Sequence, residues 1–288
     1  MLKIAYSTLP CAGWPPEEMI EYCRKYGFAG IELRESDESW ASVMLTSQAR
    51  DRIRKLFEQN GIRITNIGSS VCILGNDSED RVQKMKLLLA NIGLAADLKA
   101  CGVRIFLGNF INRHSDQKER IDHDRIVEFI QQACQLAQNF DIEIWVETHN
   151  EYGTGQALHQ LFKDVDRKNC GAIWDVMHPL EDQEAPEETL EWLGSHCRHV
   201  HIKDGRPFAD QELHRWEYTR LGEGIIPNEE IIKLLLNDHY EGFFSLEWES
   251  KWRPELQFKG AEAEIILPSY ANYMKKIASR ISQNPPIE

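Results

Sequence analysis

A glycine ends a helix-like segment, and a short run of apolar and β-branched residues follows it, at four places in the chain. The glycines are Gly27, Gly61, Gly102 and Gly242, and the runs that follow are 30–34, 62–66, 103–107 and 243–247. Glycine adopts the left-handed conformation just past a helix C-terminus without a Cβ penalty, so this pattern is typical of a helix-to-strand loop. The chain is therefore expected to alternate helices with strands.

The full alternation predicts eight strands, each followed by a helix. The strands are expected near 2–7, 30–34, 62–67, 103–107, 142–147, 171–175, 198–203 and 243–248. The helices are expected near 16–26, 47–60, 78–100, 119–139, 155–166, 187–195, 227–237 and 261–281. Eight such units match a (β/α)8 TIM barrel of the α/β class.

A doubly wound open sheet is the alternative to the barrel, because it also alternates strands and helices. No G-x-G-x-x-G motif follows the first strand, where a dinucleotide-binding fold would place it. No linker rich in Gly, Ser or Pro divides the chain. Residues 1–288 are thus expected to form a single (β/α)8 barrel domain that the C-terminal helix 261–281 closes.

Charge and hydropathy exclude several classes of partner. The chain holds 33 Lys and Arg against 46 Asp and Glu, a net charge of −13, without a basic run that could neutralise phosphates. No apolar run approaches the roughly 18 residues of a membrane span. No secretory signal is visible, and the seven cysteines form no C-x-x-C pair. We expect no nucleic acid or membrane partner, and a cytoplasmic location with free thiols.

Four predicted strands in the second half of the chain end in side chains that bind metals: Glu147, Asp175, His201 and Glu247. The C-terminal ends of barrel strands meet at one face, and alternate side chains point inward. The same alternation directs His149, Lys203 and Glu249 inward. Three carboxylates and an imidazole suit one divalent metal ion: Mn²⁺, Mg²⁺, Co²⁺ or Zn²⁺.

A single strand-end acid is most often part of a surface salt bridge, which is the alternative for each ligand taken alone. Four that converge are different, because like charges buried together repel unless a cation lies between them. For two further residues, Arg34 and Lys203, the sequence leaves two interpretations open. Arg34 is expected either to bind a substrate oxygen or carboxylate or to form an internal ion pair with Glu32. Lys203 is expected either to stabilise an enediolate oxygen or act as an acid, or to pair with Glu223 or Asp204.

Several motifs resemble the xylose isomerase-like barrels, the sugar phosphate isomerase/epimerase superfamily, over essentially the whole length. They are Asp175-x-x-His178, His199-Val-His201-Ile-Lys203-Asp204, Leu221-Gly-Glu-Gly224 followed by Pro227, and the strand-end Glu247. The resemblance implies that Glu147, Asp175, His201 and Glu247 hold the metal, as in ketose 3-epimerases, and that His178 contacts a substrate oxygen. It also implies that Glu147 and Glu247 are catalytic, and remove and return a proton through a cis-enediolate.

The chain departs from the 3-epimerase pattern at two positions. Those enzymes carry a substrate-binding arginine six residues after the ligand histidine, where this chain has Pro207, and Arg206 is expected to substitute. His149 is also unlike the 3-epimerase branch and more like uncharacterised or dehydratase-like members, and it is expected to contact substrate. The apurinic endonuclease branch uses additional histidines after its early strands, but residues 68–72 contain none.

The leading functional interpretation is a metal-dependent ketose epimerase or aldose–ketose isomerase of carbohydrate metabolism, acting on a sugar or sugar phosphate. The alternative is a metal-dependent dehydratase of the inosose or 3-dehydroshikimate type, with His178 or Lys203 as the acid. A barrel that only binds a sugar or metal is a third interpretation. The partner is expected to be a small sugar or sugar-derived ketone, and the resemblance implies a homodimer or homotetramer.

Overall fold

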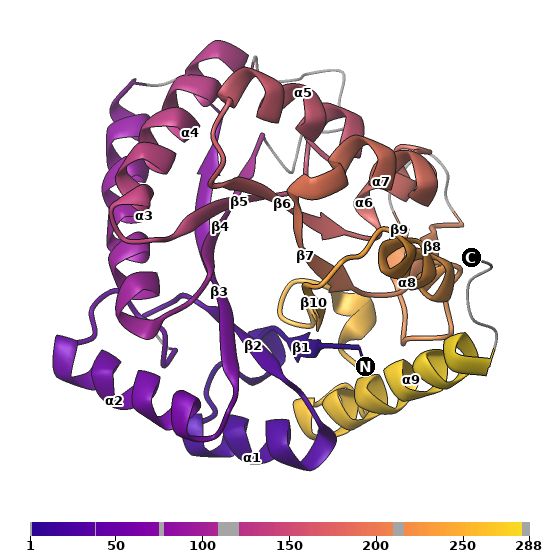
Figure 1. Ribbon diagram of the computed structural model, residues 1–288. Coiled ribbons are helices and arrows are strands. Elements are labelled where there is room, and N and C mark those ends of the chain that lie inside the picture. Colours follow the sequence, from indigo (N-terminus) through magenta and orange to yellow (C-terminus); the bar gives the residue numbers. More distant parts are fainter. Residues whose placement is uncertain (1, 38, 75–77, 109–120, 210–215, 284–288) are drawn as a thin grey trace.

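The computed structural model describes residues 2–37, 39–74, 78–108, 121–209 and 216–283. Within them, eight parallel strands form one sheet in the order β1-β10-β7-β6-β5-β4-β3-β2. The strands are β1 Ile4–Tyr6, β2 Gly30–Arg34, β3 Arg63–Ile73, β4 Gly102–Leu107, β5 Glu143–Glu147, β6 Cys170–Asp175, β7 Cys197–Ile202 and β10 Phe243–Leu246. Figure 1 shows this sheet curled into a ring with helices around its outside.

The ring closes where β1 meets β2. Ser7 and Glu32 form an isolated parallel bridge, and the Thr8 amide donates to the Glu32 carbonyl at 2.9 Å. An open doubly wound sheet would leave these edges apart. The predicted (β/α)8 barrel is therefore confirmed, and Glu32 lies at its seam.

The helices follow the expected alternation. They are α1 Pro16–Tyr26, α2 Ser47–Gln59, α3 Ser78–Leu98, α4 His123–Gln138, α5 Gly155–Val165, α6 His178–Glu181, α7 Pro186–Leu193, α8 Asn228–Asn237 and α9 Ala263–Gln283. Residues 119 and 120, with which the helix 119–139 was expected to begin, lie outside the described residues. The helix expected at 187–195 begins one residue earlier at Pro186, because proline suits the first helical turn.

Two features of the strands differ from expectation. β3 continues to Ile73 rather than 67, because it keeps pairing with β4 beyond a register shift. After β7, an antiparallel hairpin of β8 Gly205–Pro207 and β9 Trp216–Tyr218 lies in the loop before α8. All seven cysteines are free. Among the described helices, none combines the length and the apolar character needed to cross a bilayer.

The C-terminal helix α9 is held to the barrel by a buried hydrogen bond. The Tyr270 hydroxyl donates to the carbonyl of Phe244 in β10 at 2.7 Å, and the Tyr270 ring stacks on Phe28. Neither Tyr270 nor Phe244 is more than 1% exposed. This contact joins the end of the chain to the strand that precedes Glu247.

Replacing Tyr270 with phenylalanine is expected to lower the free energy of unfolding by about 1–3 kcal/mol, because it leaves a buried carbonyl without this donor. Urea unfolding followed by circular dichroism measures the change. Ser269→Ala is the control, since Ser269 is exposed on the same helix and its hydroxyl bonds only to the local Ile265 carbonyl. Equal destabilisation by both substitutions would show that this hydrogen bond does not fasten α9.

Candidate active site

Four side chains meet inside the C-terminal end of the barrel: Glu147, Asp175, His201 and Glu247. Each offers one ligand atom, and these four atoms all lie within 4.8 Å of one another. None of the four residues is more than 4% exposed. They are the residues for which the sequence predicts metal binding.

The parallel register of the strands brings these side chains to one level. Asp175 of β6 is paired with His201 of β7, and His201 is paired with Ser245 of β10, two residues before Glu247. The backbone amide of Asp175 donates to the Thr148 hydroxyl at 2.9 Å, and the Asp175 carboxylate accepts from the Met177 amide at 2.9 Å. The aspartate is thus fixed at the point where β6 ends.

His201 lies between the two glutamates. Its Nδ1 is 3.1 Å from Oε1 of Glu147 and 3.4 Å from Oε2 of Glu247. One imidazole nitrogen and two carboxylate oxygens therefore face the same small volume, which is the arrangement that a shared cation requires.

Two buried cations neutralise the carboxylates. Arg104 Nη1 is 2.6 Å from Oε2 of Glu147. Lys203 Nζ is 2.5 Å from Oδ2 of Asp175, 2.6 Å from Oε2 of Glu247 and 2.9 Å from Oε1 of Glu249. The protein itself thus supplies cationic partners for these acids, so their burial together does not by itself require a metal ion.

These contacts shift the pKa values in opposite directions. Burial and Glu247 raise the pKa of Glu147, but Arg104 and His201 outweigh them and lower it to about 2. Burial lowers the pKa of Lys203, but the charges of Asp175, Glu247 and Glu249 outweigh burial and hold it well above its ordinary value. At neutral pH, Glu147 is thus a carboxylate and Lys203 an ammonium.

The donor set fits a divalent ion. Carboxylate oxygens and one imidazole are ligands that Mg²⁺, Mn²⁺, Co²⁺ and Zn²⁺ accept, and three acids in so small a volume favour positive charge. Glu147, Asp175, His201 and Glu247 are the residues that would hold it.

A cavity of about 620 Å³ opens over this cluster and lies within the size range of small-molecule pockets. Glu147 and Glu247 form part of its wall, beside Arg34, Ser70, Arg104, Phe106, His149, Phe208, Glu249, Trp252 and Arg253. Carboxylates, guanidinium groups and aromatic rings thus surround the space that a polar substrate would enter.

His149 and His178, both predicted to contact substrate, lie against each other with ring centroids 4.7 Å apart. Burial and the neighbouring His178 lower the pKa of His149 to about 4. Burial lowers the pKa of His178, but Asp175 and Glu181 outweigh burial and raise it above its ordinary value. The pair therefore places a neutral imidazole next to one that holds its proton more strongly.

Arg34 lies on the cavity wall, but its guanidinium is held by β3. It donates to the Gly68 carbonyl at 2.5 Å and to the Ser70 hydroxyl at 2.6 Å. Glu32 contacts His199 and His201, and Arg34 contacts Gly68 and Ser70, so the two side chains do not form the alternative ion pair.

Arg206, the expected substitute for the epimerase arginine, is not brought to the cluster. It lies in β8, its side chain is 53% exposed, and it pairs with Glu217 of β9. Lys203 contacts Asp175, Glu247 and Glu249 rather than the predicted partners Asp204 and Glu223. The Asp204 carboxylate instead accepts the amides of Gly205, Gly222, Gly224 and Ile226.

Arg104 is the residue that the sequence interpretation missed. Within β4 it reads as one polar position in the run Val103-Arg-Ile-Phe-Leu107. Its register partner is Trp145, which shares the inward face of β5 with Glu147. Alternation along β5 predicts that Trp145 faces inward with Glu147, but placing Arg104 beside it also requires the register between β4 and β5, which the sequence does not give.

The barrel fold is shared with solved structures of low sequence identity. The chain superposes on the probable 3-DHS dehydratase of Bacillus anthracis with a TM-score of 0.73 and 20% identity, covering 95% of this chain and 99% of that one. The D-psicose 3-epimerase of Clostridium cellulolyticum, solved with D-tagatose, gives a TM-score of 0.74 and 18% identity over 96% of this chain and 99% of that one. Both likenesses concern the fold.

Curated relatives match part of the chain. An inosose dehydratase of Clostridium botulinum is 27% identical over 124 residues, which are 38% of this chain and 42% of the relative. The first three curated relatives are matched over only 41%, 42% and 39% of their own length. These matches therefore concern part of each relative rather than its whole activity.

The family match spans most of the chain. Residues 20–266 match the family described as the xylose isomerase-like TIM barrel. This range includes seven of the eight barrel strands and all four candidate ligands. The chain belongs to the xylose isomerase-like TIM barrel family.

Proposed function

We propose that this chain is a divalent-metal-dependent dehydratase that acts on a sugar-derived cyclic ketone. The reaction removes the proton next to the carbonyl and expels the β-hydroxyl as water. The single observation that carries this proposal is the placement of two side chains beside the candidate ligands. His149 lines the cavity together with Glu147 and Glu247, and Lys203 Nζ contacts Asp175 and Glu247.

The cations on the glutamates bear on the choice between dehydration and epimerisation. An epimerase that uses two glutamates needs one of them to be protonated when it returns the proton. Arg104 and Lys203 oppose that protonation, because they stabilise Glu147 and Glu247 as carboxylates. A dehydratase needs a base and an acid, and His149 and Lys203 are the corresponding groups here.

Each residue then has a defined part. Glu147, Asp175, His201 and Glu247 would hold a divalent ion, which would supply positive charge next to a substrate carbonyl. His149 accepts the proton at a ring nitrogen, and Lys203 Nζ donates a proton to the departing hydroxyl. His178 orients a substrate oxygen, and Arg34 and Arg104 on the cavity wall bind further substrate oxygens. Arg206 stays a prediction for substrate binding, and its present partner is Glu217.

A ketose epimerase or isomerase is the second candidate, and one observation favours it. Glu147 and Glu247 approach the same His201 nitrogen from two different strands, as proton transfer on two faces of a substrate would require. The solved D-psicose 3-epimerase has the same fold. The metal site and the initial proton removal are common to both candidates.

Metal analysis of the purified protein, followed by a substrate screen in D₂O, tests the proposal. We expect one divalent ion per chain, and release of water from 2-keto-myo-inositol or 3-dehydroshikimate with a new ultraviolet absorbance of the conjugated product. Incorporation of one solvent deuterium into ketoses without such absorbance would favour the epimerase. Ligand binding without metal-dependent turnover across both substrate classes would indicate a barrel that only binds sugar or metal.

Three further properties belong to the proposal. We propose that residues 1–288 form one domain, that the protein forms a homodimer or homotetramer, and that it works in the cytoplasm. The seven free cysteines support a reducing compartment. Sedimentation velocity of the full chain measures its oligomeric state.

A further inference from the structure

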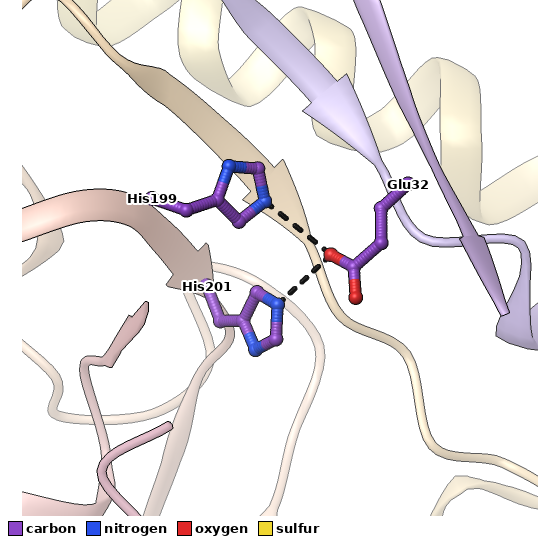
Figure 2. Close-up of side chains that lie close together, drawn as sticks. All are labelled: Glu32, His199 and His201. Carbon is purple, nitrogen blue, oxygen red and sulfur yellow. Dashed lines mark hydrogen bonds and ion pairs between the residues drawn. The ribbon is translucent and has the colours of Figure 1, made fainter. Parts of the chain in front are cut away.

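Glu32 contacts His201 on the side of the ring that faces away from Glu147 and Glu247. Its Oε2 is 2.9 Å from Nε2 of His201 and 3.3 Å from Nε2 of His199, and Figure 2 shows this oxygen between the two imidazoles. Glu32 is 1% exposed, and both histidines are fully buried. A buried carboxylate needs a hydrogen-bond donor, and Nε2 of His201 is positioned to supply one.

The two nitrogens of His201 face different carboxylates. Nδ1 points to Glu147 and Glu247, and Nε2 points to Glu32. A histidine that binds a metal through one nitrogen presents a lone pair there and carries its proton on the other. The group that accepts the second nitrogen's proton therefore fixes both the tautomer and the orientation of the ring.

The backbone around Glu32 keeps this carboxylate in place. Glu32 lies at the β1–β2 seam, where its carbonyl accepts the Thr8 amide at 2.9 Å. Gly68 of β3 lies beside the carboxylate, and a Cβ at that position would approach Oε1 of Glu32 to 3.1 Å. The barrel therefore fixes Glu32 at the closing strand pair and leaves room for its side chain.

A second metal ion between Glu32, His199 and His201 is the other interpretation of this group, since their ligand atoms also lie within 4.8 Å of one another. That ion would need Nε2 of His201 while Nδ1 serves the first ion, so the imidazole would have to lose both protons. Without His201, only Glu32 and His199 remain as ligands in this group. A hydrogen bond to Glu32 satisfies the same atoms without that cost.

We propose that Glu32 is a positioning residue that accepts the Nε2 proton of His201 and so presents Nδ1 to the divalent ion. The proposal rests on the proposed metal-dependent function. His199 lies beside the same carboxylate oxygen, with its Nε2 3.3 Å away. Partners of this kind typically change metal affinity about 10-fold to 100-fold.

Isothermal titration of the metal-free protein with Zn²⁺ tests the proposal in three variants. Glu32→Met keeps the length of the side chain but accepts no proton, and we expect its Kd for Zn²⁺ to rise about 10-fold to 100-fold. Glu32→Gln keeps an accepting oxygen, so most of the affinity should return. Glu21→Met on the exposed face of α1 is the matched control and should bind like the parent.

Nitrogen-15 NMR of the Zn²⁺-loaded protein gives a readout besides affinity. The parent and Glu32→Gln should show His201 with a protonated Nε2 protected from exchange, and Glu32→Met should lose that protection. Circular dichroism checks that each variant is folded, and Glu32→Gln remains informative if Glu32→Met is not.

Three results would overturn the proposal. A Kd for Zn²⁺ within threefold of the parent in Glu32→Met would show that Glu32 does not position His201. Two ions per parent chain, with one lost in Glu32→Gln, would establish the second metal site instead. A parent that binds no divalent ion would contradict the proposed function itself, and this outcome is distinct from the first two.

Discussion

Replacing Glu147 with glutamine is expected to lower kcat/KM by at least about 10³-fold, because the substitution removes the charge of a proposed metal ligand from the point where substrate charge would develop. It also leaves Arg104 without the carboxylate that lies 2.6 Å from its Nη1. An uncompensated guanidinium next to the site opposes the binding of a divalent cation. We therefore expect weaker metal binding together with the loss of turnover, measured by titration and by steady-state kinetics at raised metal concentration.

Glu128→Gln is the matched control, because it makes the same chemical change on an exposed side chain of α4. It should leave both kcat/KM and metal affinity unchanged. Activity of Glu147→Gln within tenfold of the parent would contradict the assignment of Glu147 as a ligand. Glutamine has nearly the same shape as glutamate, so a folded variant is expected, and circular dichroism verifies it.

The barrel could be predicted from the sequence because its signals are local. A glycine after each of several helices and a short apolar run after each glycine mark the units, and Gly27 and Gly61 do have positive φ angles of 83° and 67°. The convergence of Glu147, Asp175, His201 and Glu247 was also predictable, since alternation along a strand and the common C-terminal face of a barrel follow from the fold alone.

The contacts between distant strands could not be predicted in the same way. Glu32 and His201 are 169 positions apart in the chain, and only the closure of the barrel brings them to 2.9 Å. Arg104 was missed because an arginine within a strand has no local sign of its partner. The partner of Lys203 was left open for the same reason, since Asp204 and Glu223 are near in sequence whereas Glu247 is near in space.

The hairpin of β8 and β9 shows a further limit of sequence patterns. Each strand has three residues, which is too short for a hydrophobic period to be recognised. Arg206 was expected in the site because it lies one residue before the position of the arginine in the resembled 3-epimerases, and the hairpin pairs it with Glu217. The number of residues between two motif positions therefore predicts where a residue lies along the chain, but it does not predict where a loop side chain points.

Replacing Lys203 with methionine is expected to lower kcat about 10²-fold to 10⁴-fold, the range for loss of a general acid. The same change should strengthen metal binding, or leave it within tenfold of the parent. Lys203 Nζ contacts oxygens of Asp175 and Glu247, both of which are candidate ligands. The ammonium therefore opposes a divalent cation at these oxygens, and methionine removes that opposition while keeping a long side chain in place.

The stability of Lys203→Met separates this role from a structural one. Without metal, the variant leaves Asp175 and Glu247 buried without the ammonium, and removal of one partner from a buried ion pair costs about 3–5 kcal/mol. A divalent ion replaces the lost positive charge, so added metal should raise the melting temperature of Lys203→Met more than that of the parent. Lys233→Met on α8 is the control, because Lys233 is 40% exposed and pairs only with Glu229. Loss of both turnover and metal binding in Lys203→Met would show that Lys203 holds the ligand side chains in position rather than serving as the acid. Removing a residue that acts only as an acid should leave the candidate ligands in place and metal binding intact.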